Sequence, residues 1–255
     1  MTFLSRVRYA LLPAGIHLAC SVAVAMVAAT FVLGLWYPYP YRELSGGREL
    51  FLLVVAVDVV CGPLLTLVLF NSAKPRTELW RDLGMIALIQ LAALGYGTFI
   101  VWQARPMFLV MEVDRFKAVQ LIDLDRAALA SLPHTLQPGL LSGPINVAIR
   151  LPIDREEANK VLFESVQGGR DYAERPEFYI PYVGEAALKS LKRAKPLSIF
   201  LQKYPDQQAA ARKLSREKNA DITQWQYLPV VARQDWVVIL DKQGQIQGFL
   251  RGDGF

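Results

Sequence analysis

The sequence predicts a membrane protein in which three transmembrane α-helices precede a mixed α+β extracytoplasmic domain. Residues 1–103 carry only 12 of the 51 charged residues of the 255-residue chain, so the composition changes near residue 104. Three apolar runs lie in this first part, at residues 11–36, 50–70 and 83–103. Each has at least the roughly 20 residues that a helix needs to cross the hydrocarbon core of a bilayer. We therefore expect a membrane domain at 1–103 and a polar domain at 104–255.

The first apolar run is expected to stay in the protein as an anchor. Arg6 and Arg8 precede it, which is typical of a cleaved signal peptide, the main alternative. The run is, however, longer than the roughly 7–15 apolar residues of a signal peptide. A lipoprotein signal ending at Cys20 is disfavoured, because His17 stands where an aliphatic residue is expected.

Basic residues in the short connections predict the orientation. Five basic residues lie before the first run or in the loop at 71–82, namely Arg6, Arg8, Lys74, Arg76 and Arg81. The loop at 37–49 has two, Arg42 and Arg48. Basic residues concentrate on the cytoplasmic side. The N-terminus is therefore expected in the cytoplasm and residues 104–255 outside it, in the periplasm if the source is a Gram-negative bacterium.

Residues 104–255 alternate predicted strands and helices. β-branched and aromatic runs predict strands at 107–113, 116–122, 227–232, 236–240 and 246–250. Capping residues and basic helix ends predict helices at 155–167, 184–194 and 206–219, with Asp154 and Glu157 forming the first cap. Residues 133–152 contain four prolines and two glycines and are expected to be an irregular connection.

Asp58 is the strongest single signal for a special site. An ionised side chain at the centre of a membrane helix costs about 2.5–3.5 kcal/mol and usually faces a bundle or a partner. At about 1.5 Å per residue, Tyr96 lies at a depth close to that of Asp58, and Gln90 lies nearer the cytoplasmic side. Asp58, Gln90 and Tyr96 are therefore candidate partner-binding or intramembrane polar residues. A contact inside the bundle, without a binding role, is the equal alternative.

Two further patterns in the apolar runs concern helix shape and packing. Gly62 and Pro63 are expected to kink the second helix, or to be an ordinary tolerated proline. Small residues recur four apart, at Gly15-Ala19-Ala23, Ser21-Ala25-Ala29 and Ala93-Gly97. This spacing lets helices approach closely, either among the three spans or with a foreign helix.

The residues argue against an enzyme or a nucleic-acid-binding protein. The net charge of +5 is spread over both parts, which disfavours a nucleic-acid partner. The sequence contains two histidines, His17 and His134, and lacks phosphate-binding and nucleophile motifs. We therefore expect no catalytic residues, no metal site and no cofactor. Cys20 and Cys61 both lie in apolar runs, so the polar domain cannot depend on disulfides.

A series of short motifs resembles the type IV pilin accessory proteins of the TfpX/TfpZ group. These motifs are Trp36-Tyr37-Pro38, Leu44-Ser45-Gly46-Gly47, Val57-Asp58, Gly62-Pro63-Leu64-Leu65-Thr66, Ile89-Gln90, Tyr96-Gly97, Ala104-Arg105-Pro106, Asp114-Arg115-Phe116 and Asp253-Gly254-Phe255. The resemblance implies a non-enzymatic, chaperone-like protein of the bacterial inner membrane. Its implied partner is a cognate type IV pilin, whose stability or assembly into pili it would support. The oligomeric state is left open.

Two other function classes compete with this interpretation. A membrane sensor with an extracytoplasmic ligand-binding domain is the main alternative, although the predicted cytoplasmic segments leave no room for an output domain. An integral membrane enzyme that uses Asp58 would need a second acid, a histidine or a metal set at similar depth, and the sequence offers none.

Overall fold

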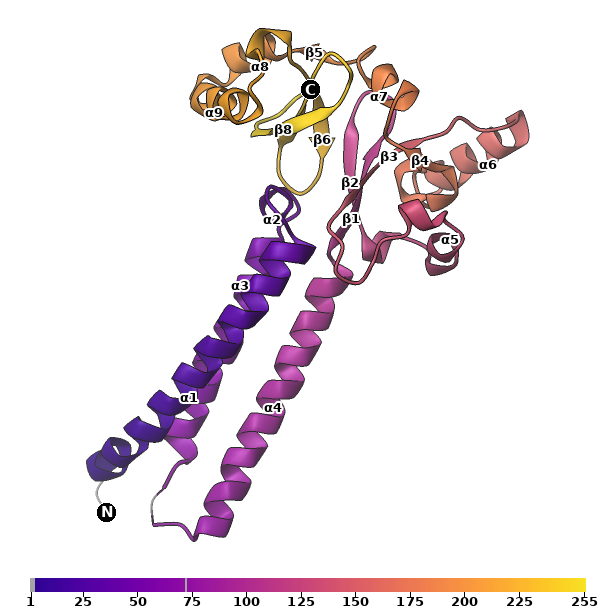
Figure 1. The fold of residues 1–255 in the computed structure, drawn as a ribbon. Helices are drawn as coiled ribbons and strands as arrows, with labels where there is room; N and C mark the ends of the chain where they lie inside the picture. Colours follow the sequence, from indigo (N-terminus) through magenta and orange to yellow (C-terminus); the bar gives the residue numbers. More distant parts are fainter. Residues whose placement is uncertain (1–2, 72) are drawn as a thin grey trace. The chain divides into compact units, whose positions relative to one another are not determined.

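A computed structural model describes residues 3–71 and 73–255, which form two compact units (Figure 1). The helical unit comprises the chain up to Tyr39 together with Gly47–Ala104. The C-terminal unit comprises Pro40–Gly46 together with Arg105–Phe255. Residues 40–46, which the sequence analysis places in the first part, thus belong to the second unit. Position 72, in the loop used above for orientation, lies outside the described residues.

The helical unit consists of three long helices. They are α1 (Phe3–Phe31), continued by a π-helical turn at Val32–Trp36, α3 (Gly47–Leu69) and α4 (Arg76–Gln103). In the described residues, three segments are long and apolar enough to cross a membrane: Arg8–Trp36, Gly47–Leu69 and Arg76–Gln103. Most of their side chains are exposed, as expected of helices surrounded by lipid. The prediction of three long apolar helices is confirmed.

The α3 helix packs against both α1 and α4. A small apolar cluster of Val32, Tyr37, Phe51 and Val101 joins the three segments at one end of the unit. The hydroxyl of Tyr37 donates a hydrogen bond to the carbonyl of Val101 at 2.9 Å. Because this hydroxyl is buried, the bond also removes the cost of an unsatisfied polar group.

The C-terminal unit is built on one mixed sheet with helices around it. Its described strands are β1 (Pro106–Met111), β2 (Phe116–Gln120), β3 (Ile145–Ile149), β4 (Tyr179–Pro181), β5 (Lys195–Pro196), β6 (Gln226–Val231), β7 (Trp236–Leu240) and β8 (Ile246–Arg251). They lie in the order β4-β3-β1-β2-β6-β7-β8, and β5 pairs with β6. The helices are α2 (Tyr41–Leu44), α5 (Arg126–Ala130), α6 (Arg155–Val166), α7 (Glu185–Ser190), α8 (Leu197–Lys203) and α9 (Gln208–Lys218).

The predicted mixed α+β character is confirmed, with one correction at residues 133–152. Within this stretch, Ile145–Ile149 forms β3, which pairs in parallel with β1 and antiparallel with β4. The expectation of an irregular connection there is wrong for these five residues. A strand this short, close to Pro144 and Pro152, is fixed by its neighbours in the sheet and not by a local pattern.

The short α2 helix is part of the main core of the C-terminal unit. Tyr41 and Leu44 are buried in the same cluster as Phe116 and Trp236. The ring of Tyr41 meets that of Phe249 edge to face at 5.8 Å. The backbone N–H of Gln234 donates to the carbonyl of Leu44 at 3.0 Å. Residues 40–46 therefore complete this core, although about 60 residues separate them from the rest of the unit.

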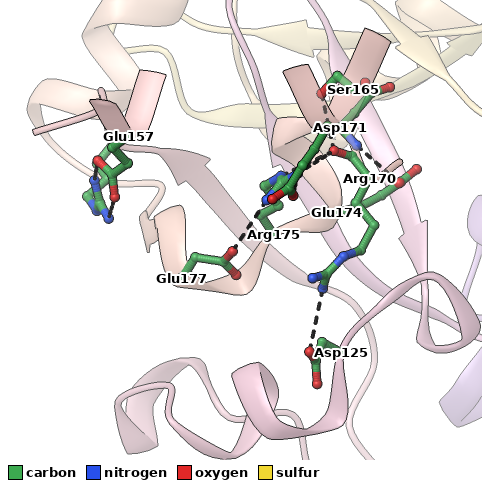
Figure 2. A network of polar contacts seen from close by, with 10 residues as sticks. Asp125, Glu157, Ser165, Arg170, Asp171, Glu174, Arg175 and Glu177 are labelled. Atoms are coloured by element: carbon green, nitrogen blue, oxygen red, sulfur yellow. Dashed lines mark hydrogen bonds and ion pairs between the residues drawn. The ribbon is translucent and has the colours of Figure 1, made fainter. Parts of the chain in front are cut away.

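Ion pairs fix α6 and the segment that follows it (Figure 2). Arg175 is buried, and its guanidinium donates to the carboxylate of Glu164 at 2.6 Å and to the carbonyl of Arg170 at 3.0 Å. At the start of α6, Arg150 donates two hydrogen bonds to Glu157, at 2.8 and 2.9 Å. Together with the N–H of Ile153, this guanidinium lowers the pKa of Glu157 to about 2. Asp154 caps the helix through the N–H of Glu157, as predicted.

Replacing Leu44→Ala is expected to destabilise the C-terminal unit by about 2–5 kcal/mol, because it leaves a cavity in a closed core. Leu162→Ala is the matched control, since 60% of the Leu162 side chain is already exposed on α6. Thermal unfolding of the full chain in detergent, followed by tryptophan fluorescence, measures both. Equal losses in the two variants would show that α2 does not belong to this core.

Candidate functional site

The structure brings two of the three predicted intramembrane residues together. The side-chain amide of Gln90 on α4 donates to the backbone carbonyl of Asp58 on α3 at 2.9 Å and to its carboxylate oxygen Oδ1 at 3.4 Å. Both side chains are half-buried between the helices. Among the described residues, Gln90 is the side chain that forms a hydrogen bond with the carboxylate of Asp58. This contact joins α3 to α4.

Gly62 provides the space that this contact needs. A Cβ atom at position 62 would lie 1.9 Å from the amide nitrogen of Gln90. The adjacent Pro63 has no N–H group, and α3 is nevertheless continuous from Gly47 to Leu69. The predicted kink at Gly62 and Pro63 stays a prediction, whereas the packing role of Gly62 is evident from the geometry.

Tyr96, the nearer candidate by depth, does not reach Asp58. It lies six residues after Gln90, and at about 100° per residue this places it roughly 240° around α4. Its side chain is 69% exposed. Gly97, seven residues after Gln90, returns to the α3 side, where a Cβ would meet Val54 at 2.5 Å. Depth in the membrane alone favours Tyr96 as the partner of Asp58. The rotation of α4 turns Gln90, and not Tyr96, toward α3.

The contact between α1 and α3 has its own polar pair and uses one of the two small-residue rows. The Nδ1 atom of His17 and the hydroxyl of Thr66 lie 2.6 Å apart. In the row Ser21-Ala25-Ala29, Ser21 is buried and the alanines are half-buried. The row Gly15-Ala19-Ala23 is exposed. The two rows therefore lie on different faces of α1, and the spacing alone did not distinguish them.

A second candidate site, which the sequence analysis missed, is a cleft of about 680 Å³ in the C-terminal unit. It is bordered by the ends of β1 and β3, by β4 and by α7. Glu112 is one of its lining residues, and burial raises the pKa of this carboxyl group. The cations Lys189, Lys192 and Arg193 line it too. The sequence shows these basic residues close together, but there they indicate only the end of a helix and not a binding site.

Replacing Gly62→Leu is expected to separate α3 from α4, because the added side chain occupies the place of the Gln90 amide. Overpacking of this kind costs about 1–3 kcal/mol. Gly84→Leu on α4 is the matched control, since nothing lies within 4 Å of a Cβ there. Thermal stability and folded yield in detergent should fall for the first variant alone. An undiminished Gly62→Leu protein would contradict the packing described here.

Comparison with known proteins finds similarity over nearly the whole chain. A family model described as fimbrial assembly protein FimB matches residues 5–46. The fimbrial assembly proteins of Dichelobacter nodosus serogroups I and E1 are each 34% identical over 248 residues, covering 94% of this chain and 94% of the relative. That of serogroups C1 and C2 is 39% identical over 110 residues, or 43% of this chain and 84% of the relative. No solved structure matches.

An identity of 34% maintained over 94% of both chains is whole-length similarity, and it includes the three apolar helices as well as the C-terminal unit. The resemblance to proteins of pilus biogenesis, found from short motifs, is confirmed by these relatives. The chain belongs to the fimbrial assembly protein family.

Proposed function

We propose that this protein is a non-enzymatic accessory factor of the bacterial inner membrane that binds a cognate type IV pilin. In this role it supports the stability of the pilin or its assembly into pili, in the manner of a chaperone. The observation that carries the proposal is the whole-length similarity to proteins named for fimbrial assembly. The three long apolar helices support a place in the lipid bilayer.

The make-up of the C-terminal unit supports the proposed topology. Residues 40–46 and 105–255 share one core, and a bilayer cannot pass through a shared core. Both segments must therefore lie on the same side of the membrane, as they do when α3 and α4 each cross it once. The distribution of basic residues supports a position of this side outside the cytoplasm. The proposed topology therefore has a cytoplasmic N-terminus and a periplasmic C-terminal unit.

This arrangement suits a partner that has both a membrane helix and a periplasmic head. The helical unit would meet the apolar helix of the pilin, and the C-terminal unit would meet its head. Of the candidate residues, Tyr96 is exposed on α4 and available to a foreign helix. Asp58 and Gln90 bond each other, which supports a role in holding α3 and α4 in place for that contact.

A reporter fused after Phe255 tests the topology. Alkaline phosphatase, which needs the periplasm, is expected to be active there, and a fluorescent protein that folds only in the cytoplasm is expected to be dark. The same pair of reporters placed in the loop between α3 and α4 should give the opposite result. Cytoplasmic activity at the C-terminus would overturn the proposed orientation.

Deletion of this protein is expected to lower the amount of its cognate pilin, because an unprotected membrane subunit is exposed to proteolysis. A photo-reactive phenylalanine in place of Tyr96 should crosslink to the pilin in membranes. The same amino acid in place of Ile86, which is buried inside the helical unit, is the control. A pilin level that does not change on deletion, together with no adduct at any exposed position, would contradict the proposal.

A further inference from the structure

The cleft in the C-terminal unit has an apolar floor formed by one row of the sheet. Met111 on β1 pairs with Ala148 on β3, and Ala148 pairs with Ile180 on β4. Paired residues of neighbouring strands point to the same face of a sheet, so these three side chains lie side by side. All three line the cleft. The floor is therefore continuous across three strands.

The opposite wall is α7, which is too short to close over this floor. It contributes Ala186, Lys189 and Ser190 and ends at Ser190. Apolar side chains remain exposed around the opening, including Leu151 at 83% and Val183 at 62%. Exposed apolar side chains grouped around a concave surface of this size are typical of a binding site.

The charge at the cleft is positive and partly unpaired. Two of the lining cations already have acidic partners: Arg150 is held by Glu157, and Lys189 lies 2.9 Å from Glu185. Lys192 and Arg193 follow directly after α7. Lys192 attracts Glu185 and Arg193 attracts Asp114 electrostatically, but none of the ion pairs within 4 Å among the described residues involves either cation. The opening therefore presents two cations to whatever enters.

Its position in the sheet favours an extended segment as the occupant. β4 is an edge strand of the sheet, opposite β8, and it borders the cleft. Extended peptides bind beside sheet edges, with alternate side chains entering pockets. A volume of about 680 Å³ is large enough for two or three apolar side chains. The adjacent cations favour a segment that also carries an acidic group.

We propose that this cleft binds an extended peptide segment of the pilin head that places apolar side chains on the Met111–Ala148–Ile180 floor and a carboxylate beside Lys192 and Arg193. This inference rests on the proposed function, since it names the surface through which the C-terminal unit meets the pilin. Burial of the exposed side chains of Val113, Leu151 and Val183 at the opening supplies affinity, because Met111 and Ala148 are themselves already buried. The two cations select acidic sequences and increase the rate of encounter.

Binding of overlapping peptides from the cognate pilin head to the full-length protein in detergent tests the proposal. Apolar peptides with an acidic residue are expected to bind, and added salt should weaken them. The double variant Lys192→Glu and Arg193→Glu should weaken binding about tenfold or more, as expected for charges at the edge of an interface. Lys213→Glu on α9 is the control, because this exposed cation lies outside the cleft.

Two further variants separate charge from shape. Ala186→Leu keeps every charge and fills part of the cleft, so it should also weaken peptide binding. Glu112→Gln removes an acidic group that lines the cleft and should strengthen the binding of acidic peptides. The melting temperature of each variant is measured alongside, and an unchanged value shows that a loss of binding does not come from unfolding.

The outcomes distinguish this proposal from the proposed function. The cleft proposal alone is overturned if pilin crosslinks to the helical unit but no head peptide binds. It is also overturned if the Lys192→Glu and Arg193→Glu double variant binds peptides as strongly as the unchanged protein. Selective binding of an anionic amphiphile such as palmitate in place of the peptides also overturns it. If no pilin adduct forms anywhere and deletion leaves pilin levels unchanged, the proposed function is overturned as well.

Discussion

The burial of residues 40–46 in the core of the C-terminal unit is the constraint on which the rest of this structure depends. Tyr41 and Leu44 fill space beside Phe116 and Trp236, and Glu43 forms an ion pair with Arg251 on β8. The chain therefore contributes to this core before α3 and again after α4. Lipid surrounds the apolar helices, whereas the C-terminal unit is stabilised by a hydrophobic core of its own. Residues 40–46 belong to that core.

Within the helical unit, individual polar contacts specify which helix faces meet. Lipid is as apolar as the helices themselves, so burial of apolar surface does not favour one face over another. The pairs His17–Thr66 and Gln90–Asp58 join α3 to α1 and to α4 respectively. Glycine at position 62 makes the second pair possible. Polar residues in these spans thus act first on the geometry of the bundle, and any partner meets a surface that they have fixed.

The C-terminal unit combines a segment held by ion pairs with an incompletely covered face. Ion pairs around Arg175 and the contact of Arg150 with Glu157 fix the segment between β3 and β4. The short α7 leaves apolar and cationic side chains exposed beside that segment. A stable monomeric surface gains nothing from such an arrangement, since exposed apolar groups favour association. An open cleft lined by apolar and cationic side chains suits the acidic segment proposed above.

The sequence by itself determined the three membrane helices, the change of composition near residue 104 and the strands of the final hairpin, because each depends on local hydrophobicity and short-range periodicity. Membership in a family of pilus assembly was also visible in short ordered motifs. Only the tertiary structure decided that Ile145–Ile149 is a strand, that Gln90 bonds Asp58 in preference to Tyr96, and that residues 40–46 complete a core far along the chain. These features depend on helix rotation and on contacts between residues distant in sequence, and no local pattern encodes either.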